Sequence, residues 1–302
     1  MDSFVDPKRL FTGNPAVVYI LPGSETFPPS SHMVELAESH NAPATTFVIR
    51  ADDDDKKTSD DVKRAKSVVK FKIRWFLGSG VELPLCGHGT LAAAYVLYEK
   101  QKVSNDTEIS FETTSGINLT VRLTKNNFIE IELPANHSLV EIQNNARLVH
   151  SCKTALRLEN ESDIVTIYEL DGKTSRPKLM IVLDSPERVA QLNPNFAELS
   201  SFNEFGIVVT AEGQKEKDSF HFTSRYFAPK ANLNEDTATG SIQCALFPYW
   251  AAKLGQEEEN HGELVTLQCS KRTGWFTGRV EDTLVILGGR ARMFAEGKTL
   301  IM

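Results

Sequence analysis

The sequence predicts a chain of two similar lobes, each a sheet wrapped around one apolar helix, because the same three features recur in each half. Each half has an aromatic strand segment, then a glycine before an apolar helical run, and then a second glycine before a further strand. The matched positions, roughly 150–160 residues apart, are Arg74 with Arg225, Gly87 with Gly240, and Gly116 with Gly274. Matched features in one order, at about half the chain length, indicate an internal duplication.

The individual elements follow from composition and periodicity. Runs rich in β-branched and aromatic residues predict strands over 16–20, 71–76, 109–111, 119–123 and 129–133. Apolar runs of helical length predict helices over 31–39, 89–100 and 241–254. The tract 51–66 is charged throughout and almost without apolar residues, so it predicts a mobile, solvated surface loop with no chemical role.

Length and charge bound the class of protein. A chain of 302 residues predicts two domains or one large one, and we place the lobes at 1–132 and 133–302, with a C-terminal tail able to cross back to the first lobe. Lys plus Arg number 33 and Asp plus Glu number 40, and the resulting charge of −7 argues against a nucleic-acid partner, which needs a clustered basic surface. Because no apolar run of about eighteen residues occurs, we expect no membrane span.

Cysteine and histidine usage predicts a reducing, cytoplasmic setting and no metal. The 4 cysteines include no CxxC pair, so they form neither a disulfide framework nor a zinc site. The 7 histidines are scattered and show no ligand spacing. No GxGxxG or GxxxxGK[ST] segment occurs, so nothing predicts a nucleotide cofactor.

The two predicted helix starts are the candidate site. A helix N-terminus offers unpaired backbone N–H groups and the positive end of the helix dipole, and glycine lets a ligand approach that backbone closely. A substrate carboxylate is therefore a natural ligand for Gly87 and Gly240, and we expect both helix starts to face one shared cleft. The alternative is that each glycine is only a tight turn before a buried helix, but a duplicated pair flanked by titratable residues favours a site.

Titratable residues flank both glycines. Cys86 and His88 adjoin Gly87, and Asp236 lies shortly before Gly240. Histidine is a donor or base near neutral pH, and a cysteine at a helix start can become reactive. Each has a structural alternative when taken alone, because His88 and Asp236 would serve as capping residues and Cys86 as a small buried hydrophobe. Their convergence on paired helix starts is what predicts chemistry.

Three motifs, spread in order over most of the chain, resemble the PhzF-like, or phenazine-biosynthesis-like, family. GNPAVV at 13–18 resembles the GNPxAV signature of that family, and ELPLCGH at 82–88 resembles its E-[LV]-P-[FL]-x-G-H segment. RYFAP at 225–229 with EDTATGS at 235–241 resembles its RxFAP…EDPxTGS segment.

The resemblance implies an α+β diaminopimelate-epimerase-like fold. That fold has two pseudo-symmetric lobes, each a barrel-like, mostly antiparallel sheet around one central helix. The resemblance also implies cofactor-independent proton transfer on a small carboxylic acid, with no cofactor and often a homodimer. The implied catalytic positions are His88 and Asp236, with Cys86 as a candidate, and the implied substrate-binding positions are Gly87, Gly89, Thr239, Gly240 and Ser241.

One departure from the family pattern affects the mechanism. The family's catalytic glutamate lies in a segment like N-x-S-E-T-[TA]-F, which reads NAPATTF at 41–47 here, so Ala44 stands at the position of the glutamate. Alanine cannot carry a proton. Three interpretations follow: Cys86 takes over the proton transfer, the chain binds a small acid without isomerising it, or Ala44 is an engineered change. A protein-interaction member of the same fold, without a ligand, is a further alternative.

Overall fold

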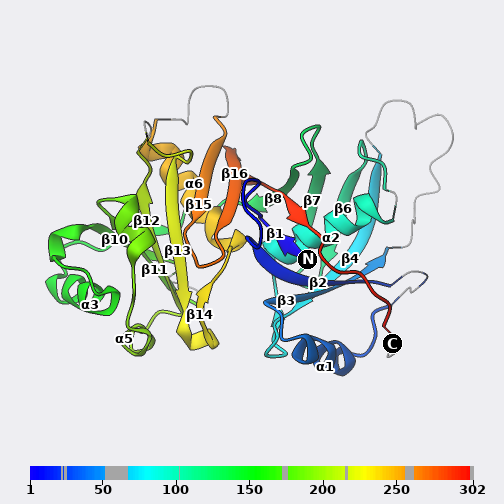
Figure 1. Cartoon of the computed structure of the whole chain (residues 1–302), viewed down its shortest axis with the longest axis horizontal. Helices are drawn as coiled ribbons and strands as arrows, with labels where there is room; N and C mark the ends of the chain where they lie inside the picture. The colour runs from blue at the N-terminus through cyan, green and yellow to red at the C-terminus, as the bar shows by residue number, and fades with distance from the viewer. Residues whose placement is uncertain are drawn as a thin grey trace. The chain divides into compact units, whose positions relative to one another are not determined.

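A computed structural model describes residues 1–299 except 22, 24–25, 52–66, 102, 172–175, 215–216 and 256–261. The chain divides into two compact units (Figure 1). Unit 1 comprises Met1–Leu133 and Ile286–Met302, and unit 2 comprises Pro134–Val285. The end of the chain therefore groups with its beginning.

Unit 1 is a sheet of parallel and antiparallel strands with two helices. β2 pairs parallel with β3, β3 antiparallel with β4, and β4 parallel with β6, after which β6, β7 and β8 are antiparallel. Its elements are β1 Asp2–Ser3, β2 Asn14–Ile20, α1 Ser30–His40, β3 Ala44–Arg50, β4 Val68–Phe76, β5 Glu82–Leu83, α2 Gly87–Glu99, β6 Glu108–Thr113, β7 Asn118–Leu123, β8 Ile129–Pro134 and β18 Ala291–Arg292.

Unit 2 repeats this pairing scheme. β11 pairs parallel with β12, β12 antiparallel with β13, β13 parallel with β15, and β15 antiparallel with β16. Its elements are β9 Leu139–Glu141, α3 Ala146–Leu156, η2 Glu161–Asp163, β10 Ile164–Leu170, β11 Lys178–Leu183, α4 Pro186–Gln191, α5 Phe196–Ser200, β12 Gly206–Glu212, β13 Phe222–Ala228, η3 Pro229–Ala231, β14 Leu233–Asp236, α6 Gly240–Lys253, β15 Leu264–Gln268 and β16 Gly274–Glu281; β17 Leu284–Gly289 follows.

The duplication predicted from the sequence is confirmed at the level of strand register. Phe76 of β4 lies opposite Thr45, and Phe227 of β13 lies opposite Ile207 at the same point of the repeat. In each unit the paired strands are followed by a short strand and then by the central helix, α2 or α6. The predicted fold class, two similar α+β lobes, is therefore correct.

The central helices are buried because they are apolar on all sides. The run from Leu91 to Ala94 in α2 has no exposed surface, and α2 packs against β2 and β3. In α6, Phe247 meets Phe222 of β13 edge to face, with 5.3 Å between ring centroids. A helix without a polar face has to lie inside the protein. Each of these helices is thus the core of its own unit.

Helix α6 contains a proline in its interior, Pro248. Proline has no backbone N–H, so the carbonyl four residues earlier loses its normal helical donor. That carbonyl belongs to Cys244, and it accepts a hydrogen bond from the backbone N–H of Asn136 at 2.8 Å. A segment at the beginning of unit 2 therefore supplies the donor that the helix lacks.

The structure extends the predicted elements and adds others. α2 and α6 begin at Gly87 and Gly240, slightly before the predicted starts at 89 and 241, since both glycines adopt helical backbone geometry. α3, α4 and α5 were not predicted, although Asn145 caps α3 by accepting from the backbone N–H of Leu148. The predicted loop 51–66 lies, except for residue 51, outside the described residues.

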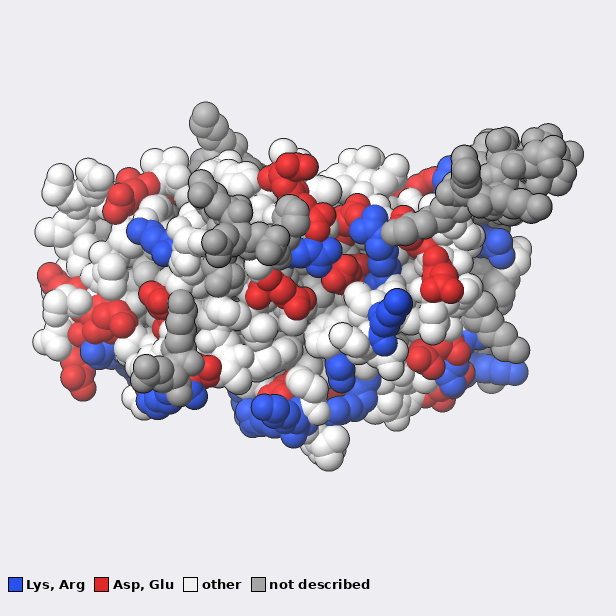
Figure 2. All heavy atoms as spheres, turned by 90° about the horizontal axis from the view of Figure 1, so that it is seen from above, with Lys and Arg blue, Asp and Glu red and all other residues white. Residues whose placement is uncertain are grey.

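Two properties of the described residues concern membrane spans and surface charge. Within the part of the chain that the structure describes, no helix is long and apolar enough to cross a membrane. Figure 2 shows acidic and basic side chains interspersed on one face of the molecule.

Candidate functional site

The start of α2 faces one side of the β3–β4 pair. Side chains alternate between the two faces of a strand, so Ala44 and Thr46 share one face of β3. Trp75 lies directly opposite Thr46 in the register and shares that face. Thr45 and Phe47 point to the other face, where Phe47 packs in a cluster with α1.

Three side-chain atoms converge on Gly89, in the first turn of α2. A Cβ at residue 89 would lie 2.7 Å from Thr46 Oγ1, 2.7 Å from Trp75 Cδ1 and 3.2 Å from Cys86 Sγ. Glycine is required there, because contacts below 3 Å would force one of these side chains to move. The absence of a side chain at Gly89 lets the hydroxyl, the indole and the thiol meet at the helix start.

Cys86 and His88 form a polar pair at the same place. The distance between Cys86 Sγ and His88 Nδ1 is 3.5 Å, and the two residues are 4% and 7% exposed. The backbone holds both in position, since Thr90 Oγ1 donates to the Cys86 carbonyl and Ser3 Oγ donates to the His88 carbonyl, each at 2.8 Å. The N-cap residue of α2, Cys86, makes no side-chain cap hydrogen bond.

Ala44 lies on the sheet face that faces α2 but carries no chemistry. It is fully buried at the first position of β3 and lies beside Ala16 of β2 in the parallel register. Ala16 packs against Ala92 of α2, so the sheet face that holds both alanines faces the helix. The position that matches the family's glutamate therefore presents only a methyl group on the face that faces α2.

Two polar atoms on this face have no hydrogen-bond partner among the described residues. They are Thr46 Oγ1 and Trp75 Nε1, on side chains that are 0% and 1% exposed. Thr45 Oγ1 is also buried and without a partner, but on the opposite face of β3. An unsatisfied buried polar group costs about 1–3 kcal/mol, so each such atom needs an explanation.

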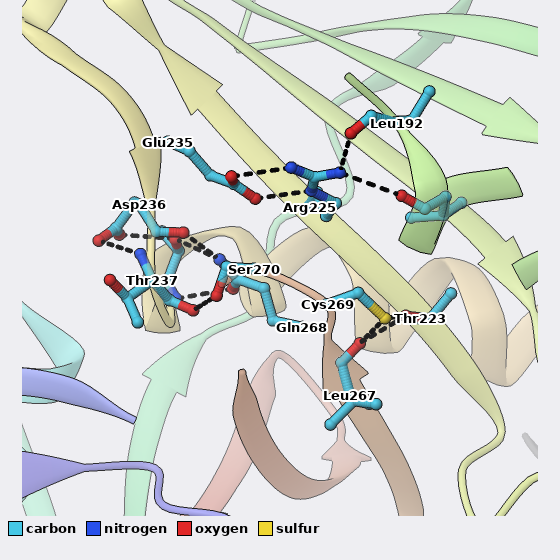
Figure 3. A network of polar contacts seen from close by, with 12 residues as sticks. Leu192, Thr223, Arg225, Glu235, Asp236, Thr237, Leu267, Gln268, Cys269 and Ser270 are labelled. Atoms are coloured by element: carbon cyan, nitrogen blue, oxygen red, sulfur yellow. Dashed lines mark hydrogen bonds and ion pairs between the residues drawn. The ribbon is translucent and has the colours of Figure 1, made fainter. Parts of the chain in front are cut away.

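The helix start in unit 2 is held by a closed polar network (Figure 3). The carboxylate of Asp236 accepts from the backbone N–H of Thr237 at 2.9 Å and from Thr239 Oγ1 at 2.6 Å. Gln268 Oε1 accepts from the Thr239 N–H at 2.8 Å, and its Nε2 donates to the Asp236 carbonyl at 2.7 Å. Asp236 therefore fixes the residue before α6, while Gly240 and Ser241 open the helix itself.

Each unit places an arginine–glutamate pair next to its helix start. Arg74 of β4 binds Glu82 through Nε and Nη2 at 2.8 and 2.7 Å, and Arg225 of β13 binds Glu235 in the same way at 2.6 and 2.8 Å. Arg225 Nη1 also donates to the Leu192 carbonyl at 2.6 Å. Bidentate pairs fix geometry as well as charge, so they position the short strands that lead into α2 and α6.

The structure thus places the predicted residues in two groups. Cys86, Gly87, His88 and Gly89 lie at the start of α2 in unit 1, and Ala44 lies on the sheet face that faces this helix. Asp236, Thr239, Gly240 and Ser241 come together in unit 2. Sequence reasoning missed Thr46, Trp75, Gln268 and both arginine–glutamate pairs. Both arginines and both glutamates lie inside the repeated motifs, which was the available signal. Within the described residues no group of histidine, cysteine and acidic side chains could hold a metal ion.

Acid should weaken unit 1 through Glu82. The hydrogen bonds and charge of Arg74 lower the pKa of the Glu82 carboxyl below its ordinary value of 4.5. A carboxyl with a lowered folded-state pKa stabilises the fold above its unfolded pKa and loses that contribution as the pH falls through the folded value. We expect the difference in unfolding free energy between wild type and Glu82→Gln to shrink below about pH 4.5.

Urea unfolding between pH 3 and 7 measures this difference. Arg74→Met should remove the same pH dependence, because it takes away the cation that lowers the pKa. A stability difference that stays constant down to pH 3 would contradict the assignment.

Two α+β units, each with a central helix that begins beside a strand pair, are typical of epimerase-like folds. A hydroxyproline epimerase from Agrobacterium vitis is similar to this chain in fold only. The two are 10% identical, with a TM-score of 0.50 over 92% of this chain and 87% of that one. The profile of the phenazine biosynthesis-like protein family (PhzC-PhzF) matches residues 1–297. The chain belongs to this family.

Relatives of similar length are found in bacteria. An uncharacterized isomerase of Pseudomonas aeruginosa is 34% identical over 290 residues, which cover 96% of this chain and 94% of that protein. The crystal structure of a PhzC/PhzF protein from Clostridium difficile is similar at a TM-score of 0.74 and 32% identity, covering 99% of this chain and 96% of that one.

Proposed function

We propose that this protein is a cofactor-independent isomerase that moves a proton on a small carboxylic acid. The observation that carries the proposal is the Cys86–His88 pair, 3.5 Å apart at the start of α2, on a helix that faces the strand of Ala44, the residue at the position of the family's glutamate. Membership of the PhzF-like family and the name isomerase given to its relatives support the reaction class.

The proposed reaction begins with the thiolate of Cys86. It removes a proton from a carbon of the substrate, and the electrons of that C–H bond pass into an adjacent unsaturated group. His88 acts as the acid and donates a proton to a different carbon. One C–H bond breaks, another forms, and no redox change occurs. The N–H groups of Gly87 and Gly89 stabilise the negative charge that develops on the carboxylate.

In unit 2 we assign to Asp236 the role of orienting the start of α6. Both of its carboxylate oxygens already accept hydrogen bonds from Thr237 and Thr239. A carboxylate occupied in this way sets the geometry of the following helix start, where the N–H groups of Gly240 and Ser241 are suited to a carboxylate. A cytoplasmic, homodimeric protein is part of the same proposal, and light scattering in solution measures the dimer.

Solvent-proton exchange tests the function. The protein is incubated in heavy water with a panel of small unsaturated and hydroxylated carboxylic acids, and proton NMR follows loss of carbon-bound protons. We expect exchange into at least one acid, at a rate proportional to enzyme concentration.

The second candidate is a member that binds small acids without isomerising them, and the methyl group of Ala44 favours it. Thermal shifts with the same panel separate the two candidates, because a ligand raises apparent stability whether or not it reacts. Stabilisation by an acid without any exchange would overturn the isomerase and leave the binding protein.

A further inference from the structure

We propose that Thr46 and Trp75 form a hydrogen-bonding subsite for a ligand carboxylate on the face of unit 1 that faces α2. This subsite rests on one part of the proposed function, the binding of a small acid, and names the donors that hold it. The subsite does not depend on whether the bound acid then exchanges a proton. It starts from the two buried polar atoms that lack partners, Thr46 Oγ1 and Trp75 Nε1.

Both atoms lie at the same point of the molecule. Thr46 and Trp75 are direct neighbours across β3 and β4, and both side chains reach Gly89 in the first turn of α2. Trp75 Nε1 is bonded to the Cδ1 atom that lies 2.7 Å from the Cβ position of residue 89. The hydroxyl and the indole N–H are therefore both adjacent to the helix start.

The chemistry of these groups selects the ligand. An indole N–H can only donate, and a threonine hydroxyl can donate as well. The dipole of α2, which begins at Gly87, adds positive potential at this end of the helix. The threonine hydroxyl can also accept, but the indole N–H cannot, so the pair at positive potential favours an acceptor that carries negative charge. A carboxylate has two oxygens to share between the two groups.

The residue at position 44 explains why the donors lack an acceptor within the chain. Ala44 lies two residues before Thr46, on the same face of β3, and its methyl group cannot accept a hydrogen bond. A ligand carboxylate then provides the missing acceptor. Cys86 Sγ also adjoins Gly89, so the thiol lies at the same helix start as the two donors.

The test compares two neighbouring threonines. Thr46→Val and Thr45→Val each remove one buried hydroxyl without a partner, from the same strand but from opposite faces. In the ligand-free protein both variants should be at least as stable as wild type, because each removes a polar group that is unsatisfied. A drop in melting temperature for Thr46→Val alone would show a structural hydrogen bond and overturn the proposal.

Binding then separates the two variants. The probe is succinate, whose binding is measured by titration calorimetry. Succinamide, which has the same carbon skeleton without the charges, is the control ligand. Thr46→Val should weaken the binding of succinate about tenfold or more, as expected for a lost hydrogen bond to a charged group. Thr45→Val should leave the affinity for succinate at the wild-type value. Trp75→Phe, which keeps an aromatic ring and removes the N–H, should weaken succinate to a similar degree.

The outcomes also separate this subsite from the isomerase. Weaker succinate binding in Thr46→Val, without exchange activity in wild type, would support the subsite and contradict the isomerase. Equal succinate affinity in wild type, Thr46→Val and Trp75→Phe would overturn the subsite, even where exchange is observed. Binding of succinamide as tight as that of succinate would also overturn it, since the site would then not select a carboxylate.

Discussion

Cys86→Ser should reduce solvent-proton exchange by about 10²–10⁴-fold, the contribution typical of a positioned general base. The serine hydroxyl occupies the place of the thiol but is a far weaker acid, so it supplies almost no anionic base at neutral pH. The fold should be preserved, because the contact that holds this position is made by the backbone carbonyl of Cys86 with Thr90 Oγ1. NMR-detected exchange in heavy water measures the loss.

The matched control is Cys152→Ala. Cys152 lies in α3 and is fully buried, and this burial raises the pKa of its thiol to about 12, so it stays protonated and takes no part in proton transfer. Its removal should leave the exchange rate unchanged. Ala44→Glu completes the comparison. If Ala44→Glu raised the exchange rate about 10²-fold or more while Cys86→Ser had no effect, a base at position 44 would be the group that transfers the proton. The assignment to Cys86 would then be wrong.

Arg225→Leu should lower the free energy of unfolding by about 3–5 kcal/mol, the loss expected when one partner of a buried ion pair is removed. The Arg225 and Glu235 side chains are only 10% and 18% exposed. The variant leaves the Glu235 carboxylate without its bidentate partner, and it takes a donor from the carbonyl of Leu192. Urea unfolding at neutral pH measures the change.

Two comparisons test the cause. Arg74→Leu should cost less, because Glu82 in the corresponding pair is 33% exposed and water can solvate the carboxylate that is left. Adding Glu235→Leu to Arg225→Leu should recover part of the loss, since no uncompensated charge remains. A double variant as unstable as the sum of the two single variants would show that the pair is not coupled.

The duplicated architecture could be predicted from the sequence because its signals are local. A glycine before an apolar run marks a helix start, and the aromatic triplets Arg74–Phe76 and Arg225–Phe227 mark the strands that lead to it. Helix α3 was not predicted, although its apolar residues Leu148, Cys152 and Leu156 recur at the four-residue spacing of a helix face. The cap at Asn145 was a second available sign of that helix.

The site was predicted only in part, since its remaining members are defined by register. Glu82 meets Arg74 because β5 folds back and pairs with β4. The short separation of the two residues in sequence does not by itself predict that strand pairing. Thr46 and Trp75 are ordinary strand residues by composition, and their position opposite one another emerges only when β3 and β4 are aligned. Residue type predicted the chemistry of Cys86 and His88, and strand pairing supplied the neighbours.

The hydrogen bond from Asn136 to the carbonyl of Cys244 has a consequence for how unit 2 opens. Proline at 248 makes helix α6 dependent on a donor more than a hundred residues earlier in the chain, so neither segment can be released without leaving a buried carbonyl unsatisfied. The two segments should therefore belong to one cooperative opening unit, with the amide of Asn136 exchanging with deuterium as slowly as the amides of the α6 core. A fragment of unit 2 that begins after residue 136 would lack this donor, and its central helix would fray from Pro248 onward.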